Sequence, residues 1–202
     1  MEDGENEGKE REKSSSLVVC IDPGHGGKDS GTTHNDIVEK DVNLKIAKML
    51  RDELKDKGAK VYMTRTDDSY VSLTDRTDIA DDKNCNLFVS VHCNYNDDTS
   101  KRGTEVYYSV KSEFAKKKLS AAISAAVSDA LDTKDRGALT RQGSDGDYYS
   151  VIRTSAAKGI PGIIVEHAFV SNSKDAEALK NDDLLRKAAK AEAQAIIDNW
   201  KK

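Results

Sequence analysis

The 202-residue sequence predicts an α/β fold: a single-domain three-layer sandwich, in which a mixed, mainly parallel sheet of about six strands is flanked by helices. Two observations predict it. Short apolar runs, typical of buried strands, alternate along the chain with amphipathic stretches that have helical spacing. The length also suits one domain with a sizeable core, and no internal repeat is present.

The predicted strands are short and rich in aliphatic residues. The first, LVVCID at 17–22, runs into a loop that begins Pro23-Gly24-His25, and AKVYMTR at 59–65 alternates as a half-buried strand does. Further strands are expected at residues 86–92, 104–109, 136–141 (an edge strand) and 162–169, where GIIVEHAF is the most apolar run of all.

The predicted helices each have one apolar face. The first runs from about Glu39 to Lys57, and Gly58 is a good C-terminal stop. A second opens after Ser72, a plausible N-cap, and ends near Asp82. Amphipathic spacing predicts helices at about 111–132 and 183–200, and shorter helices are expected at 148–157 and about 173–180.

Residues 1–16, MEDGENEGKEREKSSS, differ from the rest in composition. They have too few apolar side chains to offset the entropy of ordering, so we expect a disordered acidic tail or linker that can be deleted. The folded domain is then 17–202. The tail could be a remnant of a longer exported protein or the start of a cytosolic one, and it contains no signal peptide.

Composition excludes two classes of partner. A net charge of −4, with 34% of residues charged, argues against a nucleic-acid surface, and no run of apolar residues is long enough to span a membrane. The three cysteines, Cys20, Cys85 and Cys93, read best as small buried thiols. A metal-ligand role for Cys93 is disfavoured, because it follows His92 on a strand and should point to the opposite face.

Three predicted buried strands each lead to a side chain that can bind a metal or carry a proton. These are His25, His92 and Glu166, and Glu39 starts a helix that should return across the same edge of the sheet. Active sites of open α/β sheets lie at the carboxyl ends of the strands. Each residue alone has an ordinary explanation, such as a turn, a core histidine or a helix-start carboxylate. Their shared location favours a site.

Two imidazoles, one carboxylate and an open position form the usual catalytic zinc site. A second carboxylate that does not bind the metal can then act as general base, and Glu166 is the acid available. The Gly-rich segment matches neither phosphate-binding pattern, and no G-x-S-x-G motif supports a serine hydrolase.

These residues lie in segments that resemble the zinc-dependent N-acetylmuramoyl-L-alanine amidases of bacterial cell-wall hydrolysis (amidase type 3). The resemblance covers about residues 17–200. It is carried by VVCIDPGHGGKDSGT at 18–32, EKDVNLKIAKML at 39–50, VYMTRTDD at 61–68, VSLTDRTDIA at 71–80, LFVSVHCNYND at 87–97, RGALT at 136–140 and PGIIVEHAFVSN at 161–172.

The resemblance implies that His25, Glu39 and His92 bind one Zn²⁺ per chain and that Glu166 is the catalytic glutamate. It implies cleavage of the amide between N-acetylmuramic acid and the L-alanine of the stem peptide. His167, where the family often has a small residue, should face away from Glu166, and His34 is given no role.

The resemblance also implies that peptidoglycan is the substrate, that the chain acts outside the cell or in the cell wall, and that further domains of a longer parent protein are possible partners. Two alternatives stay open: another zinc peptidase that acts on cell-wall peptides, and a non-catalytic wall-binding module. The module is disfavoured because none of the four site residues is missing.

Overall fold

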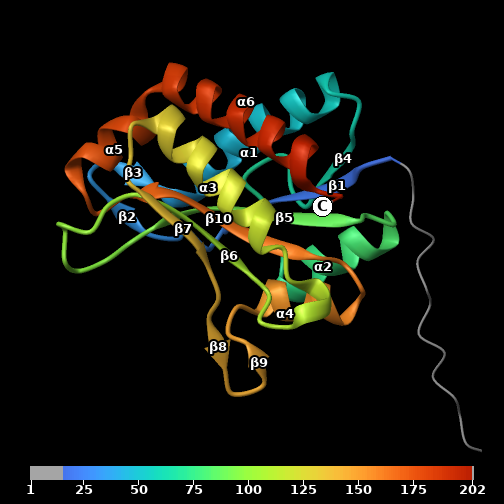
Figure 1. Ribbon diagram of the computed structural model, residues 1–202. Helices are drawn as coiled ribbons and strands as arrows, with labels where there is room; N and C mark the ends of the chain where they lie inside the picture. Colours follow the sequence, from blue (N-terminus) through green and yellow to red (C-terminus); the bar gives the residue numbers. More distant parts are fainter. Residues whose placement is uncertain (1–15, 202) are drawn as a thin grey trace, which may run out of the picture.

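The computed structural model describes residues 16–201, so the predicted tail lies, apart from Ser16, outside the described residues. Six strands form one sheet in the order β4-β1-β5-β10-β6-β7 (Figure 1). Neighbouring strands are parallel except β10 and β6, which are antiparallel. The strands are β1 (Val18–Pro23), β4 (Lys60–Met63), β5 (Leu87–Asn94), β6 (Thr104–Tyr108), β7 (Asp135–Leu139) and β10 (Gly162–Phe169). The prediction of a mixed, mainly parallel sheet of about six strands is confirmed.

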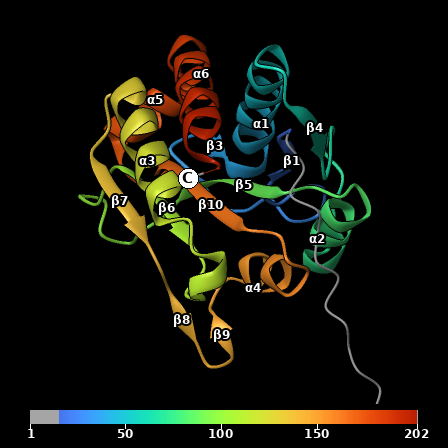
Figure 2. The same cartoon turned by 45° about the vertical axis from the view of Figure 1, so that its right-hand side comes forward.

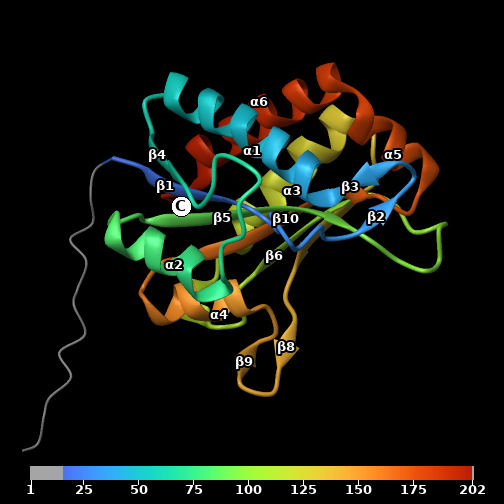
Figure 3. The same cartoon turned by 180° about the vertical axis from the view of Figure 1, so that it is seen from behind.

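Helices cover both faces of this sheet, which gives three layers (Figures 2 and 3). One face carries α1 (Glu39–Asp56), α3 (Lys117–Leu131), α5 (Ser173–Lys180) and α6 (Asp182–Asn199). The other carries the shorter α2 (Leu73–Asp82) and α4 (Ser150–Ala157). The predicted Ser72 cap is present: the amide of Asp75 donates to Ser72 Oγ at 3.2 Å.

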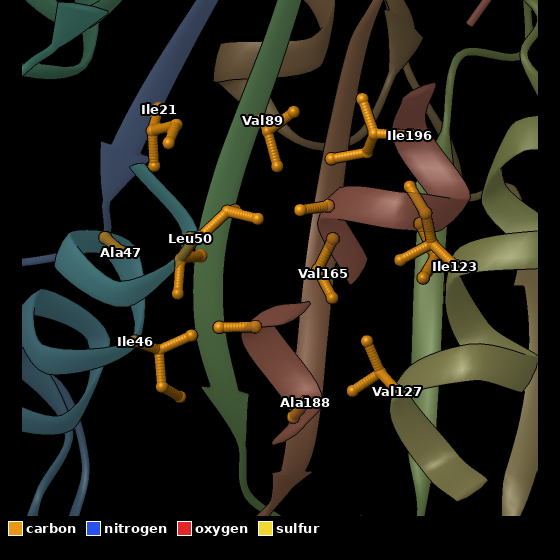
Figure 4. Close-up of a cluster of buried hydrophobic side chains, with 14 of the residues drawn as sticks. Ile21, Ile46, Ala47, Leu50, Val89, Ile123, Val127, Val165, Ala188 and Ile196 are labelled. Atoms are coloured by element: carbon orange, nitrogen blue, oxygen red, sulfur yellow. The ribbon is translucent and has the colours of Figure 1, made fainter. Parts of the chain in front are cut away.

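The core is divided between the two faces, because successive side chains of a strand point in opposite directions. The larger cluster, part of which Figure 4 shows, joins Val89 and Val165 of the sheet to Leu50, Ile123 and Ile196 of the long helices. The smaller cluster packs Cys20, Phe88 and Ile164 against α2 and α4. The side of the sheet under α2 and α4 is therefore less covered, and this side carries the site described below.

Two expectations about element ends were wrong. The strand expected at 86–92 does not end at His92 but continues as β5 to Asn94, whereas β10 has the expected bounds, with a shift of register between Glu166 and Phe169. The helix expected from 111 begins at Lys117, after a short turn η1 (Ser112–Phe114), because the backbone of Ala115 is extended and interrupts helical geometry.

Two small hairpins were not predicted. The first joins β2 (Thr33–His34) and β3 (Ile37–Val38), and the second joins β8 (Gln142–Gly143) and β9 (Gly146–Asp147). In the first, Asn35 and Asp36 both have positive φ, of 50° and 60°, as a type I′ turn requires. The Asn-Asp pair between β-branched residues was the sequence signal for it.

Candidate metal centre

The structure brings His25, Glu39 and His92 together at one edge of the sheet. His25 lies in the loop after β1, Glu39 is the first residue of α1, and His92 lies near the end of β5. Glu39 Oε1 is 3.3 Å from His25 Nε2 and 3.1 Å from His92 Nδ1. One possible ligand atom from each residue lies within 4.8 Å of the other two. The first and last of these residues, His25 and His92, are 67 positions apart in the sequence, and the parallel sheet brings them together.

The loop that carries His25 is held in an unusual conformation. His25 has φ 61°, in the left-handed region that only a small fraction of non-glycine residues adopt. Two buried arginines hold the backbone there. Arg76 donates to the carbonyl oxygen of His25 at 2.9 Å, and Arg65 donates to that of Gly24 at 2.9 Å. Strain maintained by surrounding contacts is typical of functional sites.

A buried carboxylate in turn fixes one of these arginines. Asp22 accepts hydrogen bonds at 2.7 Å from Arg76, Thr64 and Ser90. Sequence reasoning assigned no role to Asp22, Arg65 or Arg76, although two of the quoted family segments contain the arginines. The available signal was for Asp22, a carboxylate at the end of the apolar run LVVCID, since such groups are rarely buried unless paired; Arg65 and Arg76 stand among threonines and aspartates and gave no such signal.

Two glycines leave the space that the side chains of the cluster occupy. A Cβ on Gly24 would lie 2.2 Å from His92 Cε1, and one on Gly31 would lie 2.6 Å from His25 Cδ2 and 2.7 Å from Glu39 Oε2. Any larger residue at either position would displace a ligand. Gly31 also has φ +63°, which favours glycine independently of the space.

Hydrogen bonds orient the ligands. Asp29 Oδ2 lies 2.9 Å from His25 Nδ1, so Nε2 is the nitrogen that faces Glu39. A carboxylate on the far nitrogen is the usual partner of a metal-binding imidazole. The second oxygen of Glu39 accepts from the amide of Thr32 at 2.9 Å. Asp29 was missed by sequence reasoning, although its place four residues after His25 was a usable signal.

The protonation states of the three residues depend on each other. Burial lowers the pKa of His25, but the Glu39 and Asp29 carboxylates outweigh that effect and raise it to about 9. Burial likewise lowers the pKa of His92 and contact with Glu39 raises it, with a net rise. Burial raises the pKa of Glu39, but the two histidines hold it well below its usual range. The cluster therefore concentrates negative charge on Glu39 between two imidazoles.

Glu166 lies next to this cluster without belonging to it. In the sheet it is paired with His92 of β5 on one side and with Glu105 of β6 on the other. Its Oε2 atom is buried and has no hydrogen-bond partner among the described residues. The pKa of Glu166 is raised to about 7, mainly by burial. The positive charge of His92 lowers this pKa, and the negative charge of Glu39 raises it.

The three converging residues fit a zinc ion. Imidazole nitrogen and carboxylate oxygen suit a borderline-soft divalent ion, and three protein ligands leave a position for substrate. The glycines at positions 24 and 31 make room for the ligands, and the unpartnered oxygen of Glu166 is available for a reacting group.

The remaining residues that sequence analysis considered lie outside the centre. His167 faces the opposite side of the sheet, as predicted, where its Nε2 lies 3.0 Å from the buried Glu192 Oε2. Cys93 also points to that side, into the larger core cluster, and Cys20 and Cys85 are buried in the smaller one. His34 lies on β2, beside the ring of Tyr95.

A cleft of about 520 Å³ opens over the two histidines of this cluster. Its floor includes His25, His92 and Ile164. Its walls come from α2, α4 and the chain around them, and they carry the exposed side chains of Tyr70, Leu73 and Tyr148 and the half-buried ring of Tyr149. Such a concave site with a few convergent polar groups is the usual form of a ligand site.

Residues 19–198 match the sequence profile of the N-acetylmuramoyl-L-alanine amidase family. The chain belongs to this family. It is 38% identical over 175 residues to the N-acetylmuramoyl-L-alanine amidase LytC of Bacillus subtilis, covering 86% of this chain and 34% of LytC. It is 34% identical over 198 residues to the probable cell wall amidase LytH of Staphylococcus aureus, covering 96% of this chain and 60% of LytH.

Solved structures agree with this family assignment. An N-acetylmuramoyl-L-alanine amidase of Clostridium difficile 630 superposes with a TM-score of 0.83 and 30% identity, over 94% of this chain and 99% of that one. The catalytic domain of CwlV, an N-acetylmuramoyl-L-alanine amidase from Bacillus (Paenibacillus) polymyxa, superposes with a TM-score of 0.80 and 31% identity. The match covers 92% of this chain and 98% of that domain. The chain thus has the size of a whole solved amidase domain but spans about a third of the length of LytC.

Proposed function

We propose that this chain hydrolyses the amide between N-acetylmuramic acid and L-alanine in peptidoglycan, with one zinc ion held by His25, Glu39 and His92 and with Glu166 as general base. The observation that carries the proposal is the arrangement of the site. Two histidines and a carboxylate converge, a second carboxylate, Glu166, stands beside His92 with one buried, unpartnered oxygen, and both histidines line a cleft. The family and its named amidases supply the bond that is cleaved.

The proposed mechanism assigns a proton path to Glu166. A pKa of about 7 lets this carboxylate accept a proton from the attacking water and return it to the departing nitrogen near neutral pH. Zinc, when bound, supplies a Lewis acid that polarises the carbonyl and makes water more acidic. Asp29, by bonding His25 Nδ1, keeps the imidazole oriented with Nε2 toward the centre.

Glu166→Gln tests the assignment that separates a catalyst from a zinc-binding protein. Glutamine keeps the shape of glutamate but cannot carry the proton, so peptidoglycan turnover should fall roughly 10²–10⁴-fold while zinc content stays at one ion per chain. The matched control is Glu177→Gln on the exposed surface of α5, which should change neither quantity. Product masses should show intact stem peptides freed from glycan.

Three results would contradict the proposal in different ways. Loss of zinc from Glu166→Gln would make Glu166 a ligand and Glu39 the base. Full activity with zinc retained would remove Glu166 from the mechanism. Peptides cut internally would indicate a zinc peptidase, and the absence of any turnover by the zinc-loaded chain would indicate a wall-binding module.

The place of action is part of the proposal. The probable cell wall amidase LytH supports action outside the cell or in the cell wall. No helix among residues 16–201 is both long and apolar enough to cross a membrane. Because LytC is about three times as long as its matched part, further domains of a longer parent protein are plausible partners for this chain.

A further inference from the structure

A second buried carboxylate lies beside Glu166 on the open face of the sheet. Glu105 of β6 is the cross-strand neighbour of Glu166, and it is only 3% exposed. It accepts hydrogen bonds from Asn94 Nδ2 at 2.8 Å and from the hydroxyl of Tyr107 at 2.9 Å. The proposed mechanism uses none of these three side chains.

Arg136, on the edge strand β7, completes this group. Its Nε donates to Glu105 Oε2, and its guanidinium lies 5.2 Å from the ring centroid of Phe169. Its side chain is 28% exposed. Among residues 16–201, its two Nη atoms donate no hydrogen bond, whereas the buried Arg76 and Arg65 use theirs fully on backbone carbonyls and acids. Arg136 is therefore a cation whose position is fixed by Glu105 and whose Nη atoms remain available as hydrogen-bond donors.

The position of Arg136 relative to the reacting bond follows from the sheet. Neighbouring strands are about 4.8 Å apart, so the carboxylate of Glu105, and the guanidinium in contact with it, lie roughly 5–8 Å from that of Glu166. An extended chain advances about 3.3–3.6 Å per residue. The free Nη donors are thus within reach of a group about two residues beyond a bond that is cleaved at Glu166.

We propose that Arg136 binds a carboxylate on the peptide half of the substrate, at the residue that follows the alanine of the scissile amide. The inference rests on the proposed function. It assigns the carboxylate to the peptide half because the lactyl carboxyl of the glycan half is itself consumed in the amide bond. A guanidinium with two outward N–H groups is the side chain that best matches a carboxylate.

Glu105 is a positioning residue in this scheme. By engaging Nε, it fixes the guanidinium of Arg136 and leaves both Nη atoms available, and its own place is fixed by Asn94 and Tyr107. Asn94 follows His92 by two residues on the same face of β5, so the peptide subsite and the metal centre share one strand. The alternative is that Arg136 only neutralises a buried carboxylate.

The test uses two synthetic muropeptides that differ in one group. The residue after alanine carries a free α-carboxylate in one and the corresponding carboxamide in the other. The zinc-loaded chain should show a kcat/KM about tenfold or more higher for the carboxylate, as expected for a charge-assisted hydrogen bond. In Arg136→Gln this preference should fall to about one, whatever turnover of the carboxamide remains, and Arg136→Lys should keep part of it.

A matched control removes a similar ion pair elsewhere. Arg102 is 31% exposed and pairs with the fully buried Asp175 of α5, so Arg102→Gln disturbs a comparable contact and should leave the substrate preference intact. An equal loss of activity on both muropeptides in Arg136→Gln would overturn the proposal, since that is what a purely structural role predicts. Absence of any preference in the unmodified chain would overturn it too.

A binding measurement separates this proposal from the proposed function. If the unmodified chain cleaves neither muropeptide, the amidase proposal fails, and titration with the free peptides by calorimetry still tests Arg136. The carboxylate peptide should then bind the unmodified chain more tightly than Arg136→Gln, and the carboxamide peptide should bind both equally. Equal binding of the carboxylate peptide to both chains would refute the role of Arg136.

Discussion

Gly24→Ala adds one methyl group beside His92, a proposed metal ligand, and nothing else. The φ of Gly24 is not in the left-handed region, so alanine is not strained there by its backbone. The new Cβ, however, would lie 2.2 Å from His92 Cε1 and 2.3 Å from His92 Nε2. The perturbation therefore acts on the imidazole of His92 and tests whether that ring must stay where it is.

The size of the effect follows from these distances. Non-bonded carbon atoms are normally about 3.5–4.0 Å apart, so the ring has to retreat by more than about 1 Å. Metal–ligand distances tolerate about 0.2 Å, and a misplacement of about 1 Å commonly lowers the function of a site about 10²-fold. We expect zinc affinity to fall about 10²-fold, which corresponds to about 2.7 kcal/mol.

Competition with a chelator of known affinity measures this change, and thermal unfolding of the metal-free chain checks that the fold survives. Gly162→Ala is the matched control. Its Cβ would lie 2.3 Å from Ser155 Oγ, a similar conflict with a side chain that binds no metal. It should lower stability and leave zinc affinity unchanged. Unchanged zinc affinity in Gly24→Ala would show that His92 does not need its observed position.

Two further predictions concern stability. Arg76→Met leaves the buried carboxylate of Asp22 uncompensated and should lower the free energy of unfolding by about 3–5 kcal/mol in denaturant titrations. The control Arg51→Met breaks the more exposed pair of Arg51 and Asp52 and should lower it by at most about 1 kcal/mol. Similar losses in the two variants would contradict this prediction. The second concerns pH. Since the folded pKa of His25 is raised to about 9, above the usual value of about 6.5, its ion pair with Glu39 stabilises the metal-free chain fully below about pH 6.5 and is lost as pH rises through about 9. The melting temperature of the metal-free chain should fall from pH 7 to 10, and it should fall less in Glu39→Gln. Zinc affinity should rise over the lower part of that range as protons cease to compete for the histidines. A melting temperature that rises with pH in the unmodified metal-free chain would contradict the raised pKa of His25.

Much of this fold could be predicted because its periodic patterns are strong. The strand GIIVEHAF at 162–169 was predicted with its exact bounds, and the helix from Glu39 was predicted with its correct start. A strand buried on both faces leaves a continuous apolar run, whereas a helix buried on one face leaves apolar residues at helical spacing, so the two patterns are distinct. The helix expected from 111 was too long because amphipathic spacing alone does not reveal an extended Ala115. Two-residue hairpins were missed because they bury little and depend on turn conformation.

The part of the candidate site that could be predicted consists of residues whose type alone indicates metal binding or proton transfer. His25, Glu39 and His92 converge as expected because parallel strands bring their carboxyl ends to one edge. The residues that hold them were not found. Arg65 and Arg76 act on backbone carbonyls, and such contacts depend on where loops lie in space rather than on any spacing in the sequence.

The alternation of the two central strands explains how one sheet serves both as core and as site. His92 lines the cleft, and Glu166, its neighbour on β10, lies on the same face of the sheet, while the next residue in each strand, Cys93 and His167, faces the larger core. A slip of one residue would exchange the two sets completely. The buried His167 opposes such a slip, since it contacts Glu192 of α6 by Nε2 and lies 3.3 Å by Nδ1 from the carbonyl oxygen of His92. His167, on the core side, thus links the backbone position of His92 to the packing of α6.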